Sequence, residues 1–447
     1  MALSQTRRGT VIALPQTAYG TPRTSTEVAT SGSAIECDIT IPESAVELFE
    51  RDAMRSDIDH TLPRVAGSKY GTTFSMRYPL RGWTTTAPGS ISSNPDGTKV
   101  PCFGAFHSLL NGALFNASTL AGYGYASGAV VGSGSDSDTV KIDYTSTASN
   151  LFKTGGGLIL EDADGDYRMG FIKTVTDGGG SADHTVELAV PLTETGSDFT
   201  APSDGTDTFG TITTYPEAPS SSPAGVTFLW RSADSATQLL IESAVCQSIS
   251  LSLDPKGQVM VDATVVARRI VSDTSTEASL AYTYDGATDV PVLPPATGNN
   301  AARLVFLDGA TAKAFDVESF SVELSSEIKP ILSHGAPEGC AGVIPTGYDI
   351  TVSFTALLGN SGPFDTTGAG SPPLSIETST PAIQLQIGSK PGQMLGILIP
   401  KAINVEVPKM EDRDGVLAVS YVCKPGNYTG DSATGSGGNS NFRIALG

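Results

Sequence analysis

Alternation of apolar and polar positions with a period of two is the dominant pattern along the chain. It is clearest at residues 248–253, where Ile249, Leu251 and Leu253 alternate with three serines. Because successive side chains of a strand point to opposite faces, this spacing predicts a strand with one buried face. The same pattern predicts further strands, at residues 35–41, 72–78, 259–265, 320–324 and 348–354.

Two of these strands are joined by a short segment, DPKGQ at residues 254–258. Proline and glycine suit tight turns, so residues 248–265 are predicted to form an antiparallel hairpin. Helical spacing of apolar residues occurs only twice. Residues 103–114 predict a short helix, whereas residues 43–54 fit either a helix or an extended loop, because no stop signal follows them. The chain is therefore predicted to be all-β and mostly antiparallel, with one short helix.

The composition changes between residues 117 and 224, where glycine, serine, threonine and aspartate predominate. This region holds 15 acidic and 4 basic residues, a net charge of −11 out of −20 for the whole chain. Short strands are predicted within it at residues 139–144, 157–160, 167–175 and 185–190. We interpret residues 117–224 as a small inserted β-domain, between a first part (residues 1–116) and a second part (residues 225–447) of one core.

Charge and hydropathy exclude several classes of protein. With 27 Lys and Arg against 47 Asp and Glu, the chain lacks the clustered positive charge that binding to nucleic-acid phosphates requires. Hydrophobic residues make up 39% and charged residues 17%, which is typical of a folded chain and not of a disordered one. No apolar run is long enough to cross a bilayer, and the N-terminal apolar run is too short for a signal peptide. We expect a soluble protein made in a cytoplasm.

Five cysteines are scattered singly, which predicts buried, reduced thiols and not a disulfide framework. The four histidines form no zinc-binding pattern. The best candidate for a metal site is the run of alternating carboxylates at Asp162, Asp164 and Asp166. It departs from the EF-hand pattern, however, and a solvated turn between two strands explains it better. We expect no cofactor, no metal and no enzymatic activity, because no nucleophile, phosphate-binding or dinucleotide motif is present.

Several segments, taken in order, resemble the tail tube proteins of long-tailed bacteriophages. The opening of that family is similar to VIALPQTAYGT (residues 11–21) and to the segment at 43–82, which contains ERD and LRG. A short helix, predicted here at 103–114, follows in the family. The hairpin at 244–269 resembles the central hairpin of the family, and the segments at 315–331 and 346–358 resemble its next strand pair. Residues 385–425, with IG, PK and DRDG, are similar to its C-terminal run.

The resemblance implies a tail-tube fold, a β-sandwich whose sheets close into a barrel between subunits. It further implies homohexameric rings that stack into the virion tail, with tape measure, tail terminator and baseplate proteins as partners. DNA would pass through the channel without specific binding, and the region at 117–224 would decorate the outside of the tube. The polar strand faces are then candidates for lining the channel: Ser248, Ser250, Ser252, Asp262, Ser321, Glu323, Thr351 and Ser353.

Two alternatives remain open at the level of sequence. A carbohydrate- or calcium-binding β-protein of the virion, in a receptor-binding or baseplate role, would use the acidic loops. Sugar sites usually need exposed aromatic residues, and the only tryptophans, Trp83 and Trp230, lie in or beside predicted strands. A tail terminator shares the tube fold but forms a single ring.

Overall fold

A computed structural model of the chain describes residues 10–35, 37–39, 44–50, 64–71, 73–83, 106, 109–110, 113, 124–129, 138–142, 154–161, 166–176, 184–193, 208–217, 224–232, 237–253, 258–272, 289–291, 303–308, 311–333, 335–336, 339–357, 380–389, 393–431 and 438–447. Antiparallel strands dominate these residues, and 23 strands belong to one hydrogen-bonded network. One short helix, α1 (Ser25–Ser31), has both ends described. The all-β prediction is confirmed.

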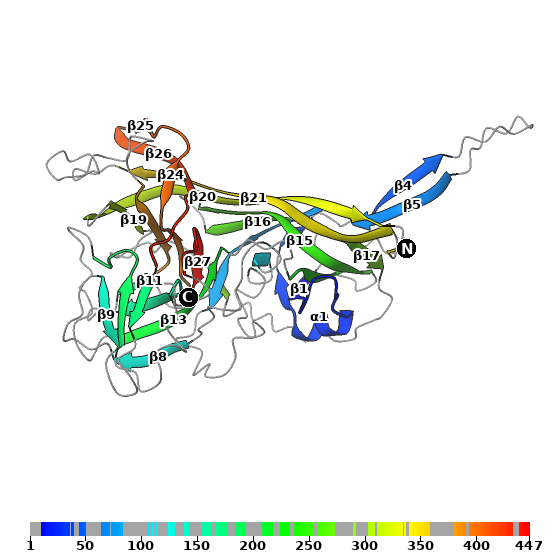
Figure 1. The fold of residues 1–447 in the computed structure, drawn as a ribbon, viewed down its shortest axis with the longest axis horizontal. Coiled ribbons are helices and arrows are strands. Elements are labelled where there is room, and N and C mark those ends of the chain that lie inside the picture. The colour runs from blue at the N-terminus through cyan, green and yellow to red at the C-terminus, as the bar shows by residue number, and fades with distance from the viewer. Residues whose placement is uncertain are drawn as a thin grey trace, which may run out of the picture.

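A long sheet crosses the molecule, and most other elements lie on one side of it (Figure 1). Five antiparallel strands form its centre, in the order β6 (Thr73–Pro79), β16 (Val259–Val266), β15 (Gln238–Leu253), β20 (Thr311–Leu332) and β21 (Cys340–Leu357). The sheet continues beyond β6 with β3 (Asp38–Ile39), and beyond β21 with β26 (Val416–Pro425), which pairs with β24 (Ala402–Asn404) and β25 (Lys409–Arg413). The predicted hairpin at residues 248–265 is therefore confirmed.

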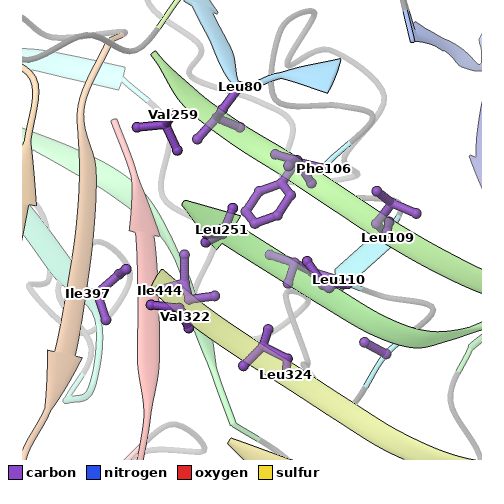
Figure 2. Packing of buried hydrophobic residues seen from close by; sticks show 14 of the residues in the cluster. Leu80, Phe106, Leu109, Leu110, Leu251, Val259, Val322, Leu324, Ile397 and Ile444 are labelled. Carbon is purple, nitrogen blue, oxygen red and sulfur yellow. The ribbon is translucent and has the colours of Figure 1, made fainter. Parts of the chain in front are cut away.

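The core lies against one face of this long sheet. Leu251, Val322 and Leu324 point from it toward Phe106, Leu109 and Leu110, and all six are buried (Figure 2). The alternation predicted at residues 248–253, 259–265 and 320–324, and in the described part of 72–78, is thus confirmed, since every second residue there is buried. Tyr348 was expected to do the same and lies in register opposite Ser326, but it is 41% exposed.

A second sheet lies against the same core and shares β15 with the long sheet. It contains β1 (Thr10–Pro15), β2 (Ser33–Ile35), β14 (Val226–Arg231) and β17 (Arg269–Ser272). β15 passes from one sheet to the other near Ser243, a buried residue with a positive φ of 48°. Gln16 holds this position by donating hydrogen bonds to the hydroxyls of Ser243 (3.2 Å) and Thr227 (2.9 Å).

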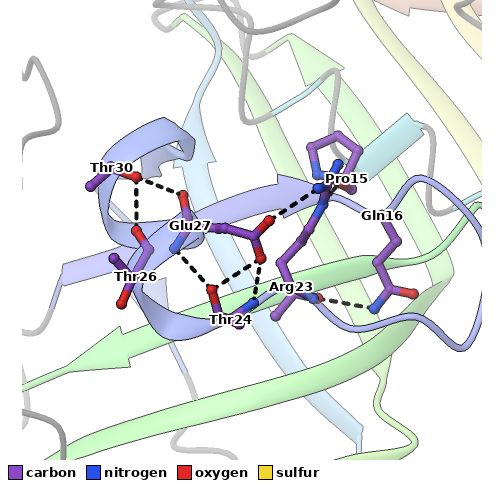
Figure 3. A network of polar contacts seen from close by, with 8 residues as sticks. Pro15, Gln16, Arg23, Thr24, Thr26, Glu27 and Thr30 are labelled. Atoms are coloured by element: carbon purple, nitrogen blue, oxygen red, sulfur yellow. Dashed lines mark hydrogen bonds and ion pairs between the residues drawn. The ribbon is translucent and has the colours of Figure 1, made fainter.

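The helix α1 covers the outer face of β1 and β14, where Val28 and Ala29 pack on Ile12 and Leu229. It begins with a capping box: the Thr24 N–H donates to the Glu27 carboxylate (2.8 Å), and the Glu27 N–H donates to the Thr24 hydroxyl (3.3 Å) (Figure 3). Because β1 and β14 are covered on both faces, they read as continuous apolar runs and not as alternating strands.

One strand of the acidic region pairs with the C-terminal strand of the chain, and the other described strands of the region pair with that strand or with one another. They are β8 (Gly124–Ala129), β9 (Thr139–Ile142), β10 (Gly157–Glu161), β11 (Tyr167–Thr176), β12 (His184–Leu188) and β13 (Thr208–Pro216). β13 pairs with the C-terminal β27 (Arg443–Leu446), which also pairs with β23 (Leu395–Ile399). Tyr215 of β13 belongs to the main core.

A smaller hydrophobic cluster joins the same region to the C-terminal half. Met169 and Phe171 of β11 pack with Val305 of β19 (Arg303–Asp308) and Leu398 of β23. β19 pairs in turn with β22 (Ala382–Ile387). Part of the apolar side chains described between residues 117 and 224 therefore packs with the rest of the chain. The boundaries at 117 and 224 and the interpretation as an inserted, decorating domain stay predictions.

Two separate pairs of strands lie outside the main network. β4 (Ser44–Glu50) pairs with β5 (Arg64–Gly71), and β7 (Arg81–Trp83) pairs with β18 (Asp289–Pro291). The helical alternative for residues 43–54 is therefore wrong, because residues 44–50 pair along a strand. In the predicted helix at 103–114, the described residues Phe106, Leu109 and Leu110 are helical and buried.

Among the described cysteines, Cys246, Cys340 and Cys423 are buried free thiols, and Cys37 is partly buried. Burial raises the pKa of the Cys423 thiol to about 12. Cys102 lies outside the described residues. In the part of the chain that is described, no helix combines the length and the hydropathy needed to span a membrane.

Candidate channel-lining face

All eight residues predicted to line a channel lie on the same face of the long sheet. Ser250 is the centre of this polar face, because it lies directly opposite Asp262 of β16 on one side and Glu323 of β20 on the other. Directly opposed residues of an antiparallel pair point to the same face. Glu323 lies opposite Thr351 of β21, and Asp262 lies opposite Arg77 of β6. One row of polar side chains thus crosses five strands.

Parallel rows flank this central row on both sides. Ser252 lies opposite Ser321, which lies opposite Ser353. On the other side, Ser248 lies opposite Thr264 and Ser325. Since the intervening residues of each strand enter the core, the sheet separates a wholly apolar face from a polar one dominated by short hydroxyl side chains.

Charges on the polar face are few, of both signs, and exposed. The Arg77 Nε lies 3.5 Å from the Asp262 Oδ1, and the Lys424 Nζ of β26 lies 2.6 Å from the Asp349 Oδ2 of β21. Together with Glu323, these five side chains sum to a charge of −1. Exposed pairs of this kind contribute little to stability, so their main effect is to keep the surface close to neutral.

The face is hollowed into an open depression of about 440 Å³, lined by Ser75, Arg77, Ser248, Ser250, Asp262 and Glu323 among others. Its walls combine hydroxyls, one guanidinium and two carboxylates with the apolar residues Ile39, Met76 and Ala263. Within the described residues, no three histidine, cysteine, aspartate or glutamate side chains gather into a metal-binding group. The depression is therefore an open surface of hydroxyl, charged and apolar side chains.

Within the described part of the chain, both edges of the central strands have stretches without a hydrogen-bonded partner. β21 pairs with β26 only from Val352 to Leu357, so for residues 340–351 no hydrogen-bonded partner other than β20 is described. At the opposite edge, the described partner of β6 beyond β16 is β3, which contributes only Asp38 and Ile39. Unpaired N–H and C=O groups on such edges are available to strands of another chain.

The acidic run considered as a metal site is only partly described. Asp162 and Asp164 lie outside the described residues, and Asp166 is partly buried just before β11. Nearby, the Tyr167 hydroxyl donates to the Glu161 carboxylate (2.7 Å) between β11 and β10. The metal interpretation of this run therefore stays a prediction.

Sequence reasoning did not name the other charged members of the polar face described above, namely Arg77, Asp349 and Lys424. The signal for two of them was present, because Arg77 and Asp349 occupy polar positions of predicted alternating strands. Lys424 could not have been found in this way, since the pairing of β26 with β21 joins segments some seventy residues apart.

No protein-family model matches this chain, and a search of curated proteins finds no relative. The functional argument therefore depends on the residues of the chain itself.

Proposed function

We propose that this chain is a structural protein whose copies assemble into rings around a channel, as in the tail tube of a long-tailed bacteriophage. The observation that carries the proposal is the polar face of the long sheet. Five adjacent strands place short hydroxyl side chains on one face and the main core on the other, and among the described residues the polar face is hollowed into an open depression.

The open edges of β6 and β21 support assembly through strand pairing. A sheet of five strands with an open edge on each side can be extended by the next copy, and repetition around an axis closes the sheet into a barrel without edges. The polar face would then line the interior of the barrel, because the core and the other elements occupy the opposite side of the sheet (Figure 1).

The composition of the polar face suits passage of DNA without retention. Ser250, Ser252, Ser321 and Ser353 offer hydroxyls but no charge, and Arg77 is neutralised by Asp262. A weakly negative wall would not hold phosphates, whereas clustered lysines and arginines would. The role in the virion, with hexameric rings and the tape measure, terminator and baseplate partners, follows from the family resemblance and is part of the same proposal.

Electron microscopy of the purified, concentrated full-length chain tests the proposal. We expect rings or tubes with a central channel. A chain that stays monomeric at high concentration, both alone and with preformed tail-tip particles as initiators, would contradict it. Under the rival interpretation, a calcium- or carbohydrate-binding protein, such monomers would bind calcium or glycans in a direct titration.

A further inference from the structure

A small recess lies between three strands of the long sheet and Glu217, the residue that follows β13. The strands are β15, β20 and β21, and Ser326 and Tyr348 are among the residues that line the recess. Its volume is about 10 Å³, which is the room that one water-sized group needs. We call it the Glu217 recess.

Glu217 is held in place by the C-terminal segment. Its backbone N–H donates to the Phe442 carbonyl (2.8 Å), and its own carbonyl accepts from the Ser440 hydroxyl (3.4 Å). The residue is only 8% exposed. Because the backbone is fixed by two hydrogen bonds and the side chain is buried, the carboxylate stays in the recess.

The Glu217 carboxylate has one hydrogen-bond donor and no counter-charge among the described residues. The donor is the Tyr348 hydroxyl. Burial and this bond to Glu217 raise the pKa of the hydroxyl, so Tyr348 keeps its proton at neutral pH. The second carboxylate oxygen, Oε2, is buried and accepts no hydrogen bond within the described part of the chain.

The cationic side chains of the adjoining strands are paired elsewhere. Lys424 of β26 forms its ion pair with Asp349, with 2.6 Å between Nζ and Oδ2. Arg443 of β27 forms its ion pair with Asp431. A carboxylate that is buried without a counter-charge is costly, because the charge has lost its water and has gained no cation in exchange. The Glu217 recess therefore has the charge and the room for one small cation.

The lining of the recess selects the kind of cation. Ser326 lies opposite Tyr348, so both residues are on the face of the sheet that also carries Leu324 and Ile350. Hydroxyl and carboxylate oxygens suit hard cations. A site for a divalent ion usually gathers several acidic side chains, and the described residues contain no group of three that could hold a metal. One carboxylate balances a single positive charge.

We propose that the Glu217 recess binds one sodium or potassium ion, held by the Glu217 carboxylate and by the hydroxyl oxygens of Tyr348 and Ser326. The ion joins the end of β13 and the C-terminal segment to β20 and β21 of the long sheet, so it stabilises the contact between them. This site does not depend on ring assembly, and its failure would leave the proposed function untouched.

Thermal unfolding of the full-length chain tests the site. Midpoints are measured in sodium, potassium and choline chloride at equal ionic strength, with EDTA present to remove divalent ions. We expect the midpoint to rise and saturate with sodium or potassium, because a ligand that binds only the folded chain stabilises it. Choline is too large for the recess and should give no such rise. Equal midpoints in all three salts would overturn the inference.

Two variants separate ion binding from general effects of salt. Glu217→Gln keeps an acceptor for the Tyr348 hydroxyl but removes the charge, so the difference between the metal salts and choline should disappear. Glu323→Gln removes an exposed carboxylate of the polar face, outside the recess, and should keep the difference seen in the parent chain. A Glu217→Gln chain that also keeps this difference would overturn the inference.

Hydrogen exchange on the parent chain gives a local measurement that needs no variant, and it decides the question if Glu217→Gln does not fold. The Glu217 amide, which donates to the Phe442 carbonyl, should be better protected in sodium or potassium than in choline. The Val28 amide of α1, which does not line the recess, is the control and should show a smaller difference. Equal protection of the Glu217 amide in all three salts would overturn the inference.

Discussion

Leu251 of β15 lies directly opposite Val322 of β20, and both side chains are fully buried. The next residue toward the N-terminus, Ser250, lies on the polar face opposite Glu323. Two consecutive residues thus lie on opposite faces of the sheet, one in the core and one on the candidate channel surface. Matched substitutions at these positions can therefore test the two faces independently.

The first prediction concerns the buried side of this pair. Leu251→Ala should lower the free energy of unfolding by about 2–5 kcal/mol through lost burial and a residual cavity. Leu251→Asp adds an unpaired buried carboxylate and should prevent folding, with a cost above about 5 kcal/mol. Chemical denaturation followed by circular dichroism measures both. Ser250→Asp is the matched control and should change stability by less than about 1 kcal/mol. Equal losses for the two aspartates would contradict the assigned faces.

The second prediction concerns the ion pair between Arg443 of β27 and Asp431. Neither side chain is exposed, and the Asp431 carboxylate also accepts from the Tyr428 hydroxyl (3.0 Å) and the Asn439 N–H (3.0 Å). Asp431→Ala should destabilise the chain by about 3–5 kcal/mol, because it leaves a buried guanidinium without its anion. Asp349→Ala removes the exposed partner of Lys424 and should cost at most about 1 kcal/mol. Similar losses of stability for the two variants, measured by thermal unfolding, would show that the pair of Arg443 and Asp431 is solvated.

The third prediction concerns pH and the capping box of α1. The N–H and hydroxyl of Thr24, together with the Arg23 charge, lower the pKa of the Glu27 carboxyl. A lowered pKa in the folded chain means that this contribution to stability is fully present above the ordinary glutamate pKa of about 4.3 and is lost as the pH falls through the lowered value. Hydrogen-exchange protection of Val28 should therefore decrease upon acidification before that of Leu251.

A matched pair of variants isolates the capping contribution. Thr24→Ala should cost about 1 kcal/mol at neutral pH, because it removes the hydroxyl that caps the Glu27 N–H. Thr30→Ala, at the other end of the helix, should leave the protection of Val28 at its parent value. Protection of Val28 that is independent of pH in the parent chain would refute the role assigned to Glu27.

The fourth prediction concerns the acidic region. Phe171 is fully buried, and Gly396 of β23 packs so closely that an added Cβ would lie 2.8 Å from the Met169 Sδ and 3.3 Å from the Phe171 ring. Phe171→Ala should destabilise the whole chain by about 3–5 kcal/mol in one transition. Deletion of residues 117–224 should prevent folding and not merely remove a decoration. A separate early transition in calorimetry, or a deletion variant that still forms rings, would contradict this prediction and support the inserted-domain interpretation.

Much of the long sheet could be predicted from the sequence, because one buried face forces a strict alternation. That applies to residues 72–78, 248–253 and 259–265, and it also placed the eight candidate channel residues on polar faces. The sequence could not place those faces side by side, since the register of β15 with β20 joins segments about seventy residues apart. Strand β4 was not foreseen, because its apolar residues fit a helical spacing as well and only pairing with β5 decides between the two.

Two other features escaped prediction for physical reasons. The helix α1 contains only seven residues, and its apolar residues Val28 and Ala29 are too few to show a period, although the Thr24 and Glu27 capping signature was present. The full lengths of β20 and β21 were hidden by register shifts near Ser319 and Ile328, which interrupt the alternation. The packing of β13 against β27 depends on contacts more than two hundred residues apart and leaves no local signal.

The central claim is that the polar face of the long sheet lines a channel. Ser250→Cys, labelled with a small gold cluster and viewed by electron microscopy along the axis of the assembled rings, tests it most directly. Thr30→Cys, labelled in the same way, and the unlabelled parent serve as controls. We predict gold density on the ring axis for Ser250→Cys and at the periphery for Thr30→Cys. Peripheral gold at Ser250→Cys, or rings without a central channel, would contradict the claim.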